Sequence, residues 1–294
     1  MRISTAFQFD NYLGSIRTAQ EAYLKVQQQI ASGKKYEAGH EDPLSTRLTM
    51  NSRHLKARFE QFDKNLRGAK DYMGNGENAL TEVGDLLNKA NVLAIQGASS
   101  SIDTNTAQSL ANQISDLQDK LVRLGNTQGS QGQYIFAGQK SDIKPFSVSG
   151  GVLTFGGDTN SIRAEVRTSE YMEINDPGVS TVVTDIYGKL ETLKTNLQGQ
   201  NVIAISEQSL KDIKLLRDQV TGLRAAIGSK MQTVENLSTE NTRRIDEFTK
   251  EISDHEEVDL AEAFVRYSQT ETAYSAAMQV ASKGMQLSLM DFLR

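Results

Sequence analysis

Apolar side chains recur at alternating intervals of four and three residues along the stretch NYLGSIRTAQEAYLKVQQQIASG, residues 11–33. The residues with this spacing are Tyr12, Ile16, Ala19, Tyr23, Val26 and Ile30. Such heptad spacing predicts a helix whose apolar seam pairs with another helix, as in a coiled coil. Gly33 comes after the last seam position, and glycine commonly follows the C-terminus of a helix.

The same spacing continues downstream of this first helix. Asp42 and Pro43 are typical of a helix start, with Asp42 as the N-cap and Pro43 in the first helical position. Heptad spacing then runs to Gly97, although Gly74 and Gly76 weaken the helix locally. Four further helices are expected. The first ends at Gly125, and the others span about Val182 to Gly199, Leu210 to Ile252 and Leu260 to Met285.

The composition changes between Gly125 and Gly178, where nine of the chain's 22 glycines and two of its three prolines lie. Aromatic residues alternate with aliphatic ones in Tyr134–Ala137, and apolar residues alternate with charged ones in Ile162–Arg167, which is the spacing of strands. Ser149-Gly150-Gly151 separates two short apolar runs and predicts a hairpin turn. We therefore expect a mainly α fold with a small β-rich insertion. The N- and C-terminal halves would form an elongated antiparallel helical bundle or coiled coil, with the termini together.

These boundaries predict five segments. The N-terminal assembly helix covers residues 1–42 and forms the terminal coiled coil with the C-terminal assembly helix, residues 256–294. The helical core consists of residues 43–130 and 181–255. The β-rich insertion, residues 131–180, is expected to lie outermost.

The composition argues against several classes of functional site. The chain has no cysteine, which excludes disulfides, Cys-ligated zinc and cysteine nucleophiles. Its net charge of −5 argues against a protein that coats nucleic acid. No apolar run reaches the roughly 18 to 20 residues of a membrane span. The three histidines, His40, His54 and His255, lie in separate segments, so we expect no enzyme activity, no metal and no cofactor.

The two terminal segments carry little charge. Residues 1–33 contain five charged side chains and residues 260–294 contain six. A helix surrounded by water usually displays more charge than this. Two interpretations follow from the pattern: helices packed on every side by neighbouring subunits, or an intramolecular coiled coil with an uncharged polar surface.

Short motifs near both ends resemble the flagellin family of bacterial axial proteins. They are MRIST at residues 1–5, QIASGKK at 29–35, EDP at 41–43, DLAEA at 259–263 and SLMDFL at 288–293. Within the family, YIFAGQKSDIKPF at residues 134–146 is more similar to the hook–filament junction proteins than to filament flagellins. The stretch Tyr36–His40 departs from the family's usual turn. The matching motif residues are Ile3, Ser4, Thr5, Gly33, Asp42, Pro43, Phe136, Gly138, Pro145 and Phe146.

The resemblance implies a structural adaptor subunit of the bacterial flagellum that joins hook to filament and assembles into a ring through its coiled-coil termini. It implies export without a cleavable signal and an extracellular location in the flagellum. The partners implied are further copies of the chain, the other hook–filament junction protein, flagellin, and an export chaperone at the C-terminal helix Leu260–Leu293. Neither nucleic acid nor membrane insertion is expected.

The assembly interface expected from the seams and the resemblance lies on both terminal helices. Its residues are Tyr12, Ile16, Tyr23, Val26, Ile30, Phe264, Tyr267, Tyr274, Met278, Met285, Leu289, Phe292 and Leu293. Within one chain, we expect the N-terminal set to pack against Phe264, Tyr267, Tyr274, Met278 and Met285.

Three other functions remain open at this point. The chain could be a flagellin-like filament subunit, because the resemblance covers features that both kinds of protein share. A cytoplasmic coiled-coil scaffold would have ordered termini but no use for the insertion. An enzyme or ligand-binding module would have its site near Lys140, Arg163 and Arg167.

Overall fold

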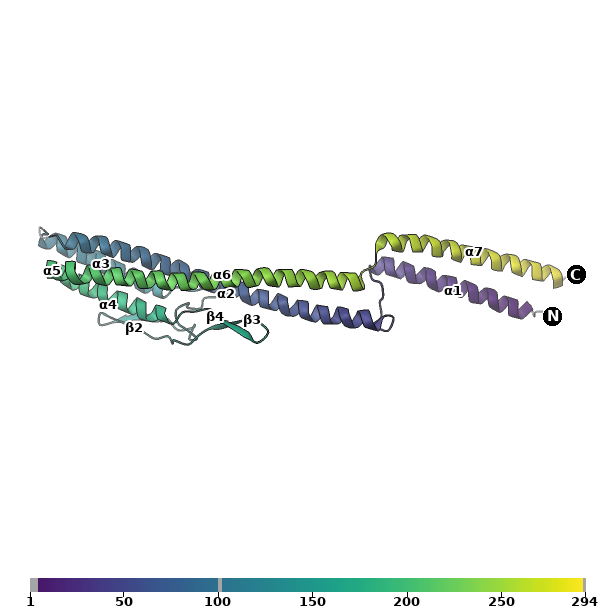
Figure 1. Cartoon of the computed structure of the whole chain (residues 1–294), viewed down its shortest axis with the longest axis horizontal. Helices are drawn as coiled ribbons and strands as arrows, with labels where there is room; N and C mark the ends of the chain where they lie inside the picture. The colour runs from purple at the N-terminus through teal and green to yellow at the C-terminus, as the bar shows by residue number, and fades with distance from the viewer. Residues whose placement is uncertain (1–4, 100–101, 293–294) are drawn as a thin grey trace. The chain divides into compact units, whose positions relative to one another are not determined.

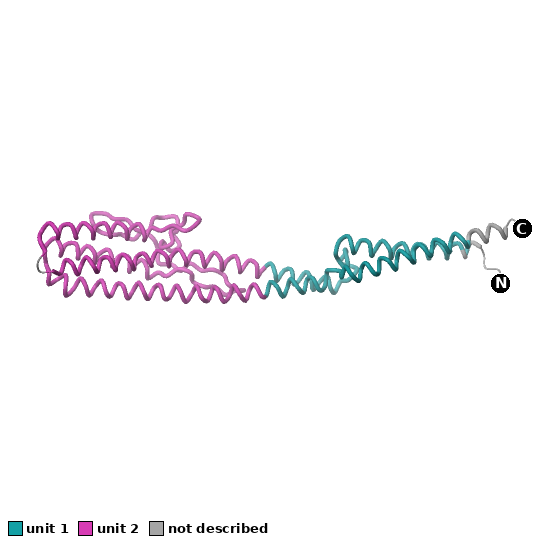
Figure 2. The backbone as a smooth tube through the Cα atoms, turned by 90° about the horizontal axis from the view of Figure 1, so that it is seen from above, with its two compact units in different colours: residues 1–57, 244–294 teal, residues 58–243 magenta. Residues whose placement is uncertain are grey.

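The computed structural model describes residues 5–99 and 102–292, apart from the side chains of Thr5, Ala6, Gln8 and residues 285–292 (Figure 1). The chain divides into two compact units (Figure 2). Unit 1 comprises residues 1–57 and 244–294, and unit 2 comprises residues 58–243.

Unit 1 contains two terminal helices that lie side by side and antiparallel, α1 (Thr5–Ser32) and α7 (Leu260–Phe292) (Figure 1). It also contains the start of α2 (Pro43–Gly97) and the end of α6 (Leu210–Glu256). Gly33 follows α1 with a positive φ of 70°, a conformation that glycine adopts without strain. The predicted end of the first helix is therefore confirmed.

Aspartate caps fix two of the helix starts in unit 1. The Asp42 carboxylate accepts the Ser45 backbone N–H at 3.0 Å, and this bond holds the pKa of Asp42 below its ordinary value. The Asp259 carboxylate accepts the N–H groups of Ala261 and Glu262, at 2.8 and 3.2 Å. The predicted N-cap at Asp42 is confirmed, and α2 continues without a break through both mid-helix glycines.

Unit 2 is a bundle formed by α2, α3 (Thr104–Gly125), α4 (Gly178–Gln198) and α6 (Figure 1). Its apolar seams face one another and form one continuous core. The largest fully buried side chains of the chain are Phe146, Leu66, Met73, Leu80, Leu87, Ile114, Leu121, Ile186, Leu190, Leu193, Leu197 and Ile205. This arrangement confirms the predicted mainly α fold with a small β insertion. Helix α4 begins at Gly178, before the expected start near Val182.

An irregular segment that the sequence did not predict precedes α6. One short turn, α5 (Val202–Ala204), leads into a π-helical turn at Ile205–Ser209, and α6 follows directly. A π turn accommodates one more residue than an α turn, so it changes the face on which later side chains lie. Here Ile205 is fully buried while Ile203 is 69% exposed.

The β insertion consists of two separate antiparallel hairpins. Strands β1 (Phe146–Ser149) and β2 (Val152–Phe155) pair across a turn in which Gly150 and Gly151 both have positive φ. This confirms the predicted hairpin, since two-residue turns of this kind require positive φ at both central positions. The second hairpin pairs β3 (Arg163–Arg167) with β4 (Glu170–Glu173).

The prediction of a strand at Tyr134–Ala137 is wrong. Tyr134 makes one isolated bridge to Gln128, and the following residues form turns. Ile135 and Ala137 are buried because the loop packs on α2, where the Tyr72 hydroxyl donates a hydrogen bond to the Ile135 carbonyl. Burial alternates here, with Ile135 and Ala137 more buried than Tyr134 and Phe136, while the backbone of the loop bonds to other loop residues such as Thr127 and Asp158.

Candidate assembly surface on the terminal helices

The predicted seam of the N-terminal helix is the face of α1 that packs on α7. Its residues are partly or fully shielded from solvent, and they are Tyr12, Ile16, Ala19, Tyr23, Val26 and Ile30. The residues between them are largely exposed. Heptad spacing therefore located the paired face of α1 correctly, whereas the role of these residues in an assembly stays a prediction.

A tyrosine cluster lies in the middle of the α1–α7 pair. The Tyr23 ring stacks on Tyr274 with centroids 6.0 Å apart and contacts the tilted Tyr267 ring at 5.2 Å. The hydroxyl groups of Tyr23 and Tyr267 are hydrogen-bonded at 2.8 Å. This bond raises the pKa of Tyr23 above its ordinary value. The structure thus brings together three of the residues that the sequence predicted to pack.

The seam of α7 differs from the prediction in two of its large residues. Phe264 and Met278 are 57% and 48% exposed, so the expectation that they pack against α1 is wrong. The more shielded positions follow heptad spacing through mainly small residues: Ala263, Tyr267, Thr270, Tyr274, Ala277, Ala281 and Gly284. The signal for this seam was present as the recurrence of small residues at intervals of four and three.

Both terminal helices also carry large apolar side chains that lie outside the α1–α7 seam and are exposed to solvent. On α1 they are Phe7, Phe9, Leu13 and Leu24, and on α7 they are Leu260, Phe264, Val265, Met278 and Val280. Their exposed fractions range from 36% for Leu13 to 60% for Phe7. Burial of such side chains is favourable by about 1.5 to 3 kcal/mol each. A run of them on one pair of helices indicates a surface that other protein covers.

One glutamate links the segment that follows the C-terminus of α1 to the segment that precedes the N-terminus of α7. Glu256, 7% exposed, forms ion pairs with Lys34 at 2.9 Å and with Arg53 at 2.5 Å. The hydrogen bond from Lys34, aided by the Arg53 charge, outweighs burial and lowers the pKa of Glu256. The Val258 N–H also donates to the Gly33 carbonyl at 2.9 Å. Glu256 was not singled out by the sequence pattern.

The loop at Tyr36–His40, which departs from the family's usual turn, is organised by Glu41. The Glu41 carboxylate accepts the backbone N–H groups of Glu37 and Ala38, each at 3.3 Å. It also pairs with Lys25 of α1 at 2.9 Å, which lowers the pKa of Glu41. The loop is therefore attached to α1 by an ion pair.

Several motif residues of the resemblance lie at helix ends or in turns. Gly33 and Asp42 end α1 and start α2, as described above. Gly138 has a φ of 67° and approaches Asp158 so closely that a Cβ would lie 2.3 Å from the Asp158 carbonyl oxygen. Ile3, Ser4 and Leu293 lie outside the described residues, and the side chains of Thr5, Met285, Leu289 and Phe292 are likewise not described.

Asn126 attaches the first hairpin to the helical bundle. Its side-chain amide accepts the Phe146 N–H and donates to the Phe146 carbonyl, both at 2.9 Å. The side chain thus makes the pair of bonds that a neighbouring strand would make. Phe146, one of the motif residues, is fully buried, and its ring packs against Gly125 and Phe155.

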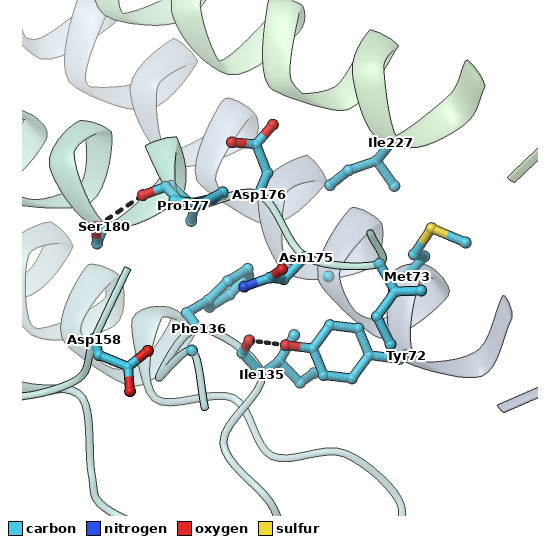
Figure 3. A pocket seen from close by; sticks show the side chains of 14 residues that line it. Tyr72, Met73, Ile135, Phe136, Asp158, Asn175, Asp176, Pro177, Ser180 and Ile227 are labelled. Atoms are coloured by element: carbon cyan, nitrogen blue, oxygen red, sulfur yellow. Dashed lines mark hydrogen bonds between the residues drawn. The ribbon is translucent and has the colours of Figure 1, made fainter. Parts of the chain in front are cut away.

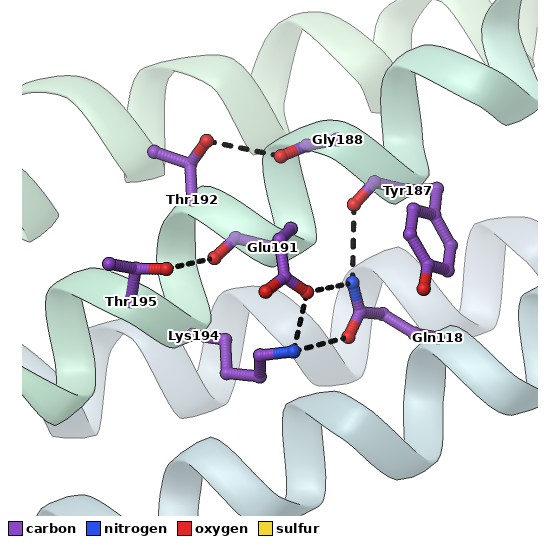
Figure 4. A network of polar contacts seen from close by, with 7 residues as sticks. All are labelled: Gln118, Tyr187, Gly188, Glu191, Thr192, Lys194 and Thr195. Atoms are coloured by element: carbon purple, nitrogen blue, oxygen red, sulfur yellow. Dashed lines mark hydrogen bonds and ion pairs between the residues drawn. The ribbon is translucent and has the colours of Figure 1, made fainter. Parts of the chain in front are cut away.

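A partly buried polar network links α3 and α4 in unit 2 (Figure 4). Gln118, 2% exposed, donates to Glu191 at 2.9 Å and to the Tyr187 carbonyl at 3.3 Å. Lys194 pairs with the same carboxylate at 2.5 Å. Burial opposes ionisation of Glu191, but the bonds from Lys194 and Gln118 hold its pKa below the ordinary value. The network satisfies its polar groups and fixes how the two helices align.

A small cavity lies beneath the loop that Tyr72 anchors (Figure 3). Its lining includes Tyr72, Phe136, Asn175 and Ile227, and burial raises the pKa of Tyr72 to about 12. About 30 Å³ is open, which is room for a water molecule. We therefore assign the cavity to packing of the loop on the helices.

Two of the three cations considered in the sequence form ion pairs with glutamates. Arg163 pairs with Glu173 at 3.3 Å, and Arg167 pairs with Glu240 at 2.5 Å. Within residues 5–99 and 102–292, no three His, Asp or Glu side chains converge as metal ligands. None of the helices in the described part of the chain combines the length and hydropathy that a membrane span requires.

Comparison with known proteins shows that the sequence of this chain is similar to those of flagellar proteins. The family description "Bacterial flagellin N-terminal helical region" matches residues 3–141. Flagellar hook-associated protein 3 of Escherichia coli K12 is 24% identical to this chain, and the alignment covers 98% of each. The Salmonella typhimurium protein of the same name is 22% identical over the full length of both chains.

Solved structures show the same fold. FlgL of Bacillus cereus aligns with a TM-score of 0.59 and 23% identity, over 68% of this chain and 97% of that one. The flagellar junction protein FlgL of Legionella pneumophila aligns with a TM-score of 0.56 and 14% identity, over 71% and 100% of the respective chains. The resemblance predicted from the sequence, to the flagellin family and within it to the junction proteins, is confirmed.

Proposed function

We propose that this chain, similar along its whole length to hook-associated protein 3, is a structural adaptor subunit of the bacterial flagellum that joins hook to filament. The similarity supports the role, because the relatives bear the names of hook-associated and junction proteins. The terminal helices would make the subunit contacts and place successive copies in a ring.

The observation that carries the proposal is the outward apolar face of α1 and α7. A lone soluble helix pair gains nothing from exposing side chains such as Phe7, Leu24 and Phe264. In an assembly, identical subunits repeated by a rotation present the same faces to each neighbour, and these side chains then become buried. The low charge of both helices fits burial on several sides.

The partners that the resemblance implies would bind this same surface. We infer that the chain contacts further copies of itself, the other hook–filament junction protein and flagellin. Before assembly, an export chaperone would cover the C-terminal helix, residues 260–293. The subunit would leave the cell through the flagellar export apparatus and function outside it as a non-enzymatic component.

The test is assembly in a bacterium that lacks its own hook-associated protein 3. Phe264→Glu places a charge on the outward face of α7 without altering its seam, so we expect purified hooks to lack the variant subunit. Ile203→Glu in unit 2 is the matched control, because Ile203 is a similarly exposed apolar residue that does not belong to either terminal helix. Circular dichroism should show the same helix content for both variants. If Phe264→Glu is incorporated as well as the parent chain, the proposed surface is wrong.

The match to the flagellin N-terminal region favours one second candidate, a flagellin-like filament subunit. The two candidates differ in what the purified chain does alone. A filament subunit elongates on added seeds of its own polymer, whereas a junction adaptor stops after a limited layer. Electron microscopy of hooks incubated with the purified chain distinguishes these outcomes.

A further inference from the structure

Gly284 occupies an unexpected place in α7. It is the single glycine in the sequence of this helix, and it lies in the seam that faces α1. A glycine inside a helix is less favourable than an alanine, which is the residue at the preceding seam positions Ala277 and Ala281. A position that breaks the local preference calls for a reason in the packing.

The reason is the ring of Tyr12 on α1. A Cβ atom at Gly284 would lie 2.8 Å from Tyr12 Cε2 and 2.9 Å from both Cζ and Oη. Carbon atoms in contact normally lie about 3.5 to 4.0 Å apart, so the tyrosine ring occupies the space that any side chain at 284 would need. The Tyr12 ring therefore inserts into a hole on α7, as in knobs-into-holes packing, and the absent side chain of Gly284 makes this hole deep enough.

The rest of the seam accepts more than one alignment of the two helices. Ala263 and Ala281 of α7 are almost fully buried, and small residues let the backbone of α1 approach closely at several places. Sliding α1 along α7 by one heptad, about 10 Å, would move Tyr12 from Gly284 to a position opposite Ala277. That residue has the Cβ that Gly284 lacks, so the ring would not fit.

A second contact supports the same alignment from the middle of the pair. Tyr23 lies 11 residues from Tyr12, about 16 Å along the helix, and meets Tyr267 and Tyr274. A one-heptad slip would separate Tyr23 from at least one of these rings. A slip of one heptad toward Ala277 would therefore lose both the fit of Tyr12 and at least one ring contact of Tyr23.

We propose that Gly284, as the hole for Tyr12, is the specificity-determining residue that selects the register in which α1 and α7 pair. The inference deepens the proposed function, because the register decides how the outward apolar side chains of α1 line up along the pair with those of α7. Gly284 would thus control the geometry of the assembly surface without contacting a partner subunit itself.

The experiment measures the register in the full-length chain. The protein has no native cysteine, so Gln20→Cys and Ser275→Cys, both at exposed positions of α1 and α7, carry the only two spin labels. Pulsed electron paramagnetic resonance then reports the distance between them. The test variant is Gly284→Leu, and the matched control is Gly14→Leu. A Cβ at Gly14 of α1 would meet no described atom within 4 Å.

The parent and Gly14→Leu should give the same narrow distance distribution. Gly284→Leu should move the two labelled positions out of alignment by up to one heptad, roughly 10 Å of helical rise. Because the labels start opposite each other, the distance between them should lengthen by less than this rise, or its distribution should broaden through loss of pairing. Adding Tyr12→Ala to Gly284→Leu should restore the parent distance, because the small residue leaves room for the leucine.

Three results would overturn the inference: a broad distribution in the parent chain, an unchanged distance in Gly284→Leu, or a double variant that stays shifted. The measurement uses the free subunit, so it stands or falls separately from incorporation into hooks, which tests the proposed function.

Discussion

Replacing Gly97 by alanine should destabilise unit 2, although the same replacement elsewhere in α2 should stabilise it. Gly97 is the last residue of α2. A Cβ there would lie 2.2 Å from Leu197 Cδ2 and 3.7 Å from Ile205 Cδ1. The leucine is 1% exposed and the isoleucine fully buried, so neither side chain can move outward to make room.

The magnitude follows from two opposing effects. Overpacking a well-packed core costs about 1 to 3 kcal/mol. The gain in helix propensity from glycine to alanine is about 1 kcal/mol in a helix interior and smaller at the last helical residue. We therefore expect Gly97→Ala to lower the free energy of unfolding by about 1 to 2 kcal/mol.

Gly68 provides the matched control within the same helix. It lies at a solvent-exposed position far from both ends of α2, and a Cβ there would meet no described atom within 4 Å. Gly68→Ala should raise the free energy of unfolding by about 0.5 to 1 kcal/mol through helix propensity alone.

Urea denaturation of the full-length variants, followed by far-ultraviolet circular dichroism, measures both changes. An unchanged m-value would show that the shift in midpoint reports stability. If Gly97→Ala stabilised the chain as much as Gly68→Ala, the packing of α4 and the π turn against the end of α2 would be wrong.

Three further predictions concern polar contacts. Gln118→Met keeps the side-chain volume but removes the bonds to Glu191 and a backbone carbonyl, so urea denaturation should show a loss of about 1 to 3 kcal/mol; an unchanged midpoint would contradict the network. Asn126→Leu removes both backbone bonds of Phe146, so hydrogen exchange in β1 should accelerate while the bundle helices keep their protection; equal protection of β1 would refute the anchor. Glu256 has a lowered pKa in the folded chain, so its contribution to stability is present above the ordinary glutamate pKa and is lost as pH falls through the folded value. Thermal unfolding of unit 1 between pH 6 and pH 3 should therefore depend less on pH in Glu256→Gln, and identical profiles would count against the ion pairs.

The sequence predicted α1 better than α7 for a physical reason. On α1 the paired face carries the large apolar residues, so counting them at heptad spacing finds the seam. On α7 the paired face carries mostly small residues such as Ala263 and Ala281, while Phe264 and Met278 point outward. Counting large apolar side chains therefore selects the wrong face wherever a helix has a second surface to bury.

Local pattern also failed where tertiary contacts replaced regular hydrogen bonding. The alternation at Tyr134–Ala137 arises from a loop anchored by Tyr72, a contact between residues 63 positions apart. The π turn before α6 is one residue longer than an α turn, and no spacing rule marks it in advance. By contrast, the hairpin at Gly150-Gly151 and the cap at Asp42 depend on local backbone chemistry, and both were predicted correctly.

The hairpin turn at Gly150-Gly151 has a consequence for protein engineering. Both glycines lie at an exposed tip, and a side chain at either would meet no described atom within 4 Å. The hairpin is held at its opposite end, where Asn126 binds Phe146. Lengthening a surface loop costs only about 0.6 kcal/mol for each doubling of its length. Foreign peptides could therefore be displayed at this tip while the helical bundle beneath it keeps its fold.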